Sequence, residues 1–155
     1  MLEIQPIEFF LRAIPEGFIY LLGVYVFSET KIDKERYVIS SLIAAVAMFA
    51  IRFLPIVFGV HTILSILFII ILSIFYNKID LISAIKGTII HFIVQYLSEG
   101  INLVLLKYIF KLNFNLLLQD PISKSILGIP SLVLSLSFIF LYYKFFSRKD
   151  GFKNV

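Results

Sequence analysis

The 155-residue chain contains no cysteine, which excludes disulfide bonds, thiolate metal sites and catalysis by a cysteine nucleophile. It is also poor in charge, because only 15% of its residues are Asp, Glu, Lys or Arg, whereas soluble domains average roughly 25%. Hydrophobic residues make up 60% of the chain, more than a soluble protein could cover with polar surface. The composition therefore predicts an integral membrane protein in the cell membrane, with the lipid bilayer as its solvent.

Motifs of the common enzyme classes are also missing. The chain has no Gly-x-Ser-x-Gly nucleophile elbow, no His-Glu-x-x-His pair and no glycine-rich phosphate loop. Its two histidines, His61 and His91, would need carboxylate help, from Glu99 for example, to hold a metal ion. We therefore expect no catalysis, no metal and no cofactor. No basic run alternates with aromatic residues, so we expect no nucleic-acid partner.

Long apolar segments predict the fold. A transmembrane helix needs about 20 mainly apolar residues, and five segments approach or exceed that length. They are residues 7–27, 37–54, 60–76, 81–110 and 126–146. The N-terminus has no positive region before its apolar residues, so it does not read as a cleaved signal peptide. We predict an all-α, multi-pass helix bundle of about five transmembrane helices, with residues 1–155 as a single integral-membrane domain.

Basic residues in the connections predict the orientation, because short loops rich in Lys and Arg favour the cytoplasm. The first and third connections and the C-terminal tail fall on one side of a five-helix bundle, and each holds Lys or Arg; on the other side, lysines occur around the fourth connection. The N-terminus is therefore expected outside and the C-terminus in the cytoplasm. The segment 112–121 is long enough for a short amphipathic piece at the outer interface, and a simple loop fits it equally well.

The stretch "IRFLPIVFGVHT" at 51–62 interrupts an apolar run that is too long for one helix. Pro55 and Gly59 favour a tight turn there. Arg52 would then lie at the outer end of the second helix and His61 at the outer start of the third. Taken alone, such interfacial residues need no function, since arginine can extend to the lipid phosphates.

The first helix carries a related segment, "RAIPEG" at 12–17. Arg12 and Glu16 are four residues apart on one helix face, so they can pair and lower the cost of placing both in lipid. Pro15 frees a backbone carbonyl at the same depth. A structural ion pair is one interpretation. A functional site is the other, because ionisable residues within a membrane segment are usually functional.

The fourth segment has a polar and small-residue stripe. At 100° per residue, its members fall within roughly a 120° arc of an otherwise aliphatic helix. They are Ala84, Gly87, His91, Gln95, Ser98, Glu99 and Asn102. Small and amide residues also mark packed helix interfaces in membranes, and we prefer that interpretation for Ala84, Gly87 and Ser98.

The predicted orientation places the charged residues of the first four helices, apart from Lys86, in the outer half of the membrane. We therefore predict a polar pocket open to the outside, which binds a small molecule or peptide. Its candidate ligand-binding residues are Arg12, Glu16, Arg52, His61, His91, Gln95, Glu99 and Asn102.

The layout, with "RAIPEG" at 12–17, "IRFLPIVFGVHT" at 51–62 and "YLSEG" at 96–100, resembles a known family. It is similar to the multi-helix membrane region of some Firmicutes sensor histidine kinases, related in plan to the accessory-gene-regulator peptide sensors. The resemblance implies an outward-facing sensor whose cytoplasmic C-terminal end acts on a kinase. The 155 residues themselves contain neither a phospho-acceptor histidine segment nor an ATP-binding domain, so we expect the chain to act as a free-standing sensor module or on a separate kinase.

Three functions remain open at this point. The leading hypothesis is a non-catalytic sensing or regulatory module that acts on a cytoplasmic histidine kinase. The second is the substrate-binding membrane subunit of a small-molecule importer, powered by separate ATPase subunits. The third is a structural or assembly factor, in which the charged residues serve folding alone.

Overall fold

The computed structural model describes residues 9–52, 54, 59–108 and 121–146. Its regular elements are helices, so the all-α prediction is confirmed for this part of the chain. A short π-helix continues directly into the first α-helix, and four further helices follow. The elements are η1 (Phe9–Ala13), α2 (Ile14–Phe27), α3 (Lys34–Arg52), α4 (Val60–Phe75), α5 (Leu81–Tyr108) and α7 (Pro121–Phe146).

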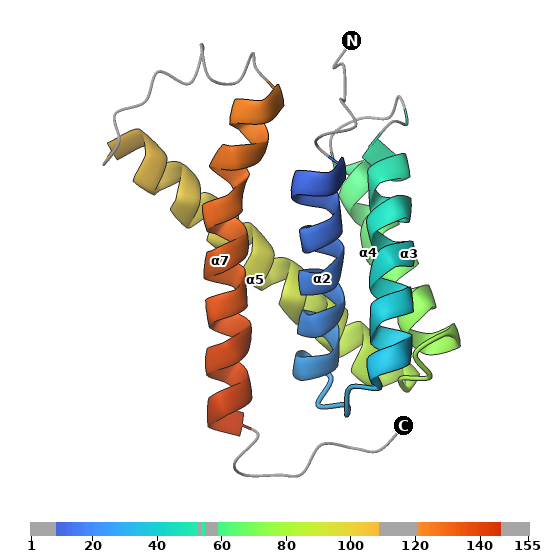
Figure 1. The fold of residues 1–155 in the computed structure, drawn as a ribbon. Helices are drawn as coiled ribbons and strands as arrows, with labels where there is room; N and C mark the ends of the chain where they lie inside the picture. Colours follow the sequence, from blue (N-terminus) through green and yellow to red (C-terminus); the bar gives the residue numbers. More distant parts are fainter. Residues whose placement is uncertain (1–8, 53, 55–58, 109–120, 147–155) are drawn as a thin grey trace.

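Successive helices alternate in direction, and the start of α2 and the end of α7 lie at opposite ends of the bundle (Figure 1). Helix α2 is central and contacts α3, α5 and α7. Helix α5 is strongly inclined and crosses behind α2 and α7, while α4 packs against α3 and α5. Because α5 crosses the bundle diagonally, residues along its length meet different partner helices in turn.

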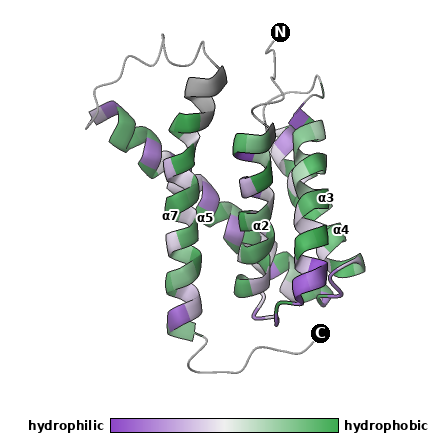
Figure 2. Cartoon of the chain, viewed as in Figure 1, coloured by the Kyte–Doolittle hydropathy of each residue, from purple (hydrophilic) through white to green (hydrophobic). Residues whose placement is uncertain are grey.

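In the part of the chain that the structure describes, three helical segments are long and apolar enough to cross a membrane: Phe10–Phe27, Leu81–Tyr108 and Ile126–Phe146. Helix α4 is apolar too, but it has only 16 residues. Hydrophobic side chains cover most of the helices, and hydrophilic ones recur along α5 and at the helix ends (Figure 2). These features are those of a membrane protein, as the composition predicts.

The helices begin and end close to the predicted boundaries, with two clear differences. Helix α7 begins at Pro121, five residues before the predicted start. Helix α3 begins at Lys34, three residues before the predicted start, because Asp33 caps it. The carboxylate of Asp33 accepts hydrogen bonds from the backbone N–H groups of Glu35 (3.1 Å) and Arg36 (3.4 Å). The preference of an acidic residue for an N-cap therefore extended the helix into a stretch that hydropathy alone assigned to a loop.

The predicted hairpin at 51–62 is described only in part. Helix α3 ends at Arg52, and Gly59 has a φ of 100° before α4 begins, a conformation that favours glycine. Pro55 lies outside the described residues, and so do the basic tail and all but the last residue of the predicted interfacial segment.

Small residues let the helices around α2 approach closely. A Cβ atom on Gly17 would lie 2.7 Å from the backbone oxygen of Ser41 in α3. A Cβ on Gly87 in α5 would lie 2.7 Å from the backbone oxygen of Val24. Such approaches are typical of membrane helices, whose association depends on van der Waals packing rather than on the hydrophobic effect. They fix α2, α3 and α5 in one register and so position the polar side chains between them.

Candidate functional site

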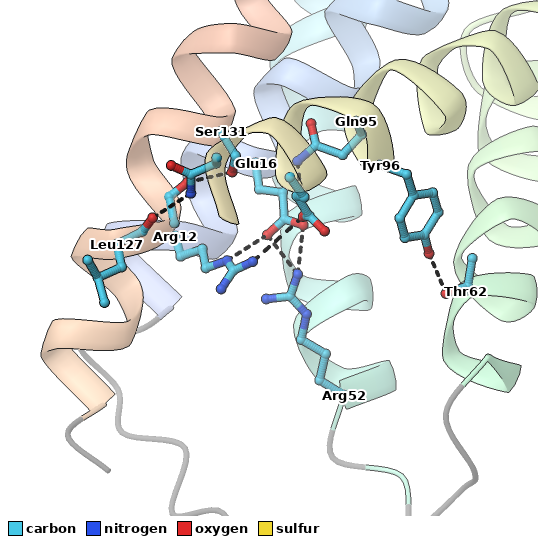
Figure 3. Close-up of polar contacts among 11 residues, drawn as sticks. Arg12, Glu16, Arg52, Thr62, Gln95, Tyr96, Leu127 and Ser131 are labelled. Atoms are coloured by element: carbon cyan, nitrogen blue, oxygen red, sulfur yellow. Dashed lines mark hydrogen bonds and ion pairs between the residues drawn. The ribbon is translucent and has the colours of Figure 1, made fainter. Parts of the chain in front are cut away.

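The charged residues predicted to lie together at one end of the bundle do so, around Glu16 (Figure 3). Glu16 is in the first turn of α2, and its side chain is only 4% exposed. The Nη2 atom of Arg52, in the last turn of α3, donates to both carboxylate oxygens at 2.7 Å. Charge-assisted hydrogen bonds of this length are among the strongest that proteins make. This pair joins the N-terminal end of α2 to the C-terminal end of α3.

Arg12 lies on the other side of the same carboxylate. Its Nε atom is 3.8 Å from Glu16, so the predicted i, i+4 pair is present, but Arg52 is the closer partner. Arg12 belongs to the π-helix η1, and Pro15 follows at the start of α2. A proline has no N–H to bond the carbonyl one turn earlier, and π-helical turns are frequent at functional sites.

Two residues of α5 extend the cluster. The Nη2 atom of Arg12 is 3.8 Å from the carboxylate of Glu99, which also accepts a hydrogen bond from the amide of Gln95 at 3.3 Å. The cluster therefore holds two arginines and two glutamates, and its formal charge is zero. We call Arg12, Glu16, Arg52, Gln95 and Glu99 the charged cluster. It joins η1, α2, α3 and α5.

Helix α7 completes the surroundings of Arg12. A Cβ atom on Gly128 would lie 3.3 Å from the Cζ and Nη1 atoms of Arg12, so the guanidinium lies against the bare backbone of α7. The side chains of Arg12, Glu99 and Arg52 are 25%, 34% and 36% exposed. The cluster is thus closed at Glu16 and Gln95 and open to the surroundings at Arg12, Glu99 and Arg52.

His61 is outside the charged cluster. Its Nδ1 atom lies 2.8 Å from the backbone oxygen of Ile51, in the last turn of α3, which also accepts a hydrogen bond from the backbone N–H of Leu54 at 3.2 Å. Its neighbour Thr62 bonds the hydroxyl of Tyr96 in α5 at 2.6 Å, apart from the cluster in Figure 3. The prediction that His61 lines the same pocket is not supported by this placement.

His91 is fully buried in α5, about two turns before Glu99. The ring packs edge-to-face on Tyr20, with centroids 4.6 Å apart, and lies directly against Gly23. Neither ring nitrogen has a hydrogen-bond partner among the described residues. The structure therefore places His91 in the interface between α2 and α5 and not in the charged cluster.

Asn102 meets α7 and not the cluster. Its amide donates a 2.7 Å hydrogen bond to the backbone oxygen of Leu127, three residues before Pro130 inside α7. The hydroxyl of Ser131 donates to the oxygen of Gly128 at 2.7 Å. Polar side chains commonly satisfy backbone groups near a proline in a membrane helix, which gives Asn102 a structural role at this contact.

A second polar group at the opposite end of the bundle was not among the sequence candidates. The carboxylate of Glu29, just after α2, pairs with Lys86 of α5 at 2.9 Å and accepts a 3.2 Å hydrogen bond from Tyr142 of α7. Glu29 lies in the most charged stretch of the sequence, where one acidic residue does not stand out. Its positive φ of 56°, at a turn, is a signal that only the structure gives.

The described residues include a cavity of about 680 Å³, but it lies between α2 and α7 and is lined by other residues than the charged cluster. No group of three or more His, Asp or Glu residues in the described ranges is placed to hold a metal ion. Searches of protein-family models, curated proteins and solved structures found no match to this chain.

Proposed function

We propose that the chain is a non-catalytic sensing module of the cell membrane that binds an anionic group through Arg12 and responds through helix α7. The carrying observation is the unused hydrogen-bonding capacity of Arg12. Within the described residues its guanidinium makes two ion pairs at 3.8 Å but no hydrogen bond. A guanidinium presents five N–H donors in a planar fork that fits a carboxylate or a phosphate.

The rest of the charged cluster supports this role. Arg52 already neutralises the buried carboxylate of Glu16 with two 2.7 Å hydrogen bonds, so Arg12 is not needed to stabilise that charge. Its second carboxylate partner, Glu99, is one-third exposed. An incoming anion therefore competes with two long ion pairs and breaks no short one.

The contact between Arg12 and Gly128 could transmit ligand binding to the other end of the molecule through α7. Arg12 lies against the backbone of α7, and α7 runs from there to Phe146 at the end of the bundle where Lys34 and Lys78 lie. Movement of the guanidinium towards a ligand would change the packing of α7 against Arg12 at Gly128. In this proposal, α7 carries the change to a cytoplasmic partner, a histidine kinase in the plan that the sequence resembles.

The topology in this proposal has five crossings, with the N-terminus outside and the C-terminus cytoplasmic. The alternating helix directions support it (Figure 1). So does the distribution of basic residues, since the cytoplasmic side favours Lys and Arg. Within the described ranges, the basic residues at the end of the bundle where α2 finishes and α3 begins are Lys31, Lys34, Arg36, Lys78, Lys86 and Lys144, against Arg12, Arg52, Lys107 and Lys124 at the other end.

The test measures stabilisation by anions of the full chain in lipid nanodiscs. Thermal unfolding is followed by circular dichroism with acetate, succinate, inorganic phosphate or glycerol 3-phosphate, and with acetamide as the uncharged control. A ligand at ten times its dissociation constant stabilises the folded state by about 1.4 kcal/mol. We expect at least one anion, and not acetamide, to raise the unfolding midpoint.

Arg12→Gln should remove this stabilisation, and Arg12→Lys should retain only part of it because lysine lacks the fork. The matched control is Lys107→Gln, which removes an exposed positive charge at the same end of the bundle. Equal anion stabilisation in wild type and Arg12→Gln, or none in wild type with any of the four anions, contradicts the proposal.

A further inference from the structure

A groove runs between α2 and α7 at the end of the bundle opposite the charged cluster. Its volume is about 680 Å³. Most of its lining residues are aliphatic or aromatic, and they come from the last turns of α2, the following loop and α7. They are Leu22, Val26, Ile32, Val133, Leu136, Ser137, Ile139, Phe140, Leu141 and Tyr143.

The wall of the groove has little capacity for polar contacts. Apart from Tyr143 at the end of the groove, Ser137 is the only lining residue with a hydroxyl group. The Ser137 hydroxyl donates a hydrogen bond to the backbone oxygen of Val133 at 2.8 Å. That hydroxyl is therefore satisfied within its own helix. A groove of this kind, on helices long and apolar enough to cross a membrane, suits a hydrocarbon chain.

The length of the groove favours a lipid acyl chain over a transmembrane helix of a partner protein. Along α7 it extends from Val133 to Tyr143, which at 1.5 Å per residue is about 15 Å. The hydrocarbon core of a bilayer is about 30 Å thick, so the groove matches the depth of one leaflet. A transmembrane helix of a partner protein would need a groove along the full thickness.

The polar end of the groove is positively charged. Lys31 adjoins Ile32 and Lys144 adjoins Tyr143, and both lysines are exposed. Neither has an ion-pair partner within 4 Å in the part of the chain that the structure describes. The nearby carboxylate of Glu29 is already paired with Lys86 at 2.9 Å, so it does not offset these two charges.

We propose that this groove is a binding site for an anionic phospholipid of the adjoining leaflet. One acyl chain lies in the groove between α2 and α7, and the phosphate group lies between Lys31 and Lys144. The apolar wall supplies affinity for the chain, and the two lysines supply the preference for an anionic headgroup. The lipid would then rest against α7, on the face that carries Val133 and Tyr143.

The test is native mass spectrometry of the full chain with equal amounts of dioleoyl phosphatidylglycerol and dioleoyl phosphatidylcholine, which share their acyl chains. A basic residue near an anionic lipid surface is worth about five-fold in binding. We expect wild type to retain one phosphatidylglycerol molecule with a preference of about 30-fold from two lysines. K31Q/K144Q should retain either lipid with little preference.

A variant that fills the groove distinguishes the contribution of the acyl chain to binding from that of the headgroup. Leu136→Trp should lose both lipids, and its fold is checked by circular dichroism. The lysine variant changes exposed side chains only, so it keeps the test valid if the tryptophan variant does not fold. The matched control K34Q/K78Q removes two exposed lysines from the same end of the molecule but not from the groove, and it should keep the preference.

Three results would overturn the proposal. The first is equal retention of the two lipids by wild type. The second is an equal loss of preference in K34Q/K78Q and K31Q/K144Q. The third is a lipid-free dimer that Leu136→Trp converts to a monomer, which would assign the groove to a second copy of the chain.

Discussion

The buried carboxylate of Glu16 has two arginine partners at unequal distances. The spacing of Arg12 and Glu16 predicts a pair, and the pair is present at 3.8 Å. The stronger partner is Arg52, which is 36 residues away and donates at 2.7 Å. Local spacing carries no information on that contact, because it depends on how α3 folds back along α2.

The same geometry predicts unequal effects of removing the two arginines. Arg52→Gln leaves the buried carboxylate of Glu16 with only the distant Arg12, and should destabilise the folded chain by about 2 kcal/mol. Arg12→Gln breaks two long and partly exposed ion pairs, and should cost less than about 1 kcal/mol. Chemical unfolding in detergent micelles measures both free energies.

The double variant Glu16→Gln/Arg52→Gln is the control for this comparison. It removes the buried charge together with its partner, so it should be more stable than Arg52→Gln alone. Equal losses in Arg12→Gln and Arg52→Gln would show that the two arginines share Glu16 evenly, contrary to the distances.

At the scale of single elements, α5 is the helix whose sequence periodicity best predicts its buried face. The 100° periodicity predicts one polar and small-residue face, and six of its seven members are buried; Glu99 is only partly so. Periodicity assigns a face but not the partner at each depth. Because α5 is inclined, Gln95 and Glu99 meet the charged cluster, His91 meets α2 and Asn102 meets α7.

The contact between His91 and Gly23 gives the test at this scale. A Cβ atom on Gly23 would collide with the imidazole ring of His91, and the ring is fully buried. Gly23→Ala should therefore separate α2 from α5 and destabilise the chain by about 3 kcal/mol, at the upper end for overpacking. Thermal unfolding in nanodiscs measures the change.

Gly100→Ala is the matched control, because a Cβ on Gly100 meets no atom within 4 Å. It should leave the stability unchanged or slightly raised, since alanine is the better helix former. A second variant, Gly23→Ala/His91→Ala, should recover part of the loss. If Gly23→Ala is as stable as Gly100→Ala, the packing of α2 on α5 is not as described.

For the whole molecule, the apolar runs predict where the helices lie, although α4 has only 16 residues and α7 begins before its predicted start. The ranges of α4 and α5 agree with the predicted segments to within two residues. The arrangement of the helices could not be predicted in the same way. The incline of α5, the central place of α2 and the groove beside α7 result from side-chain packing between segments far apart in the sequence.

The proposed topology can be tested directly because the chain has no cysteine of its own. Single substitutions Lys107→Cys and Lys34→Cys place one thiol at each end of the bundle. A membrane-impermeant maleimide added to intact cells should label Lys107→Cys only, and both variants after lysis. Labelling of Lys34→Cys in intact cells would contradict the proposed orientation.

The proposed sensing function is tested most directly by purifying the tagged full chain and Arg12→Gln from native membranes in mild detergent. Co-purifying proteins and small molecules are identified by mass spectrometry. We expect a histidine kinase in stoichiometric amount with both chains, and an anionic compound with wild type alone, because the guanidinium of Arg12 makes no hydrogen bond within the described residues. ATPase subunits in place of the kinase, or an identical set of small molecules with both chains, would contradict the account.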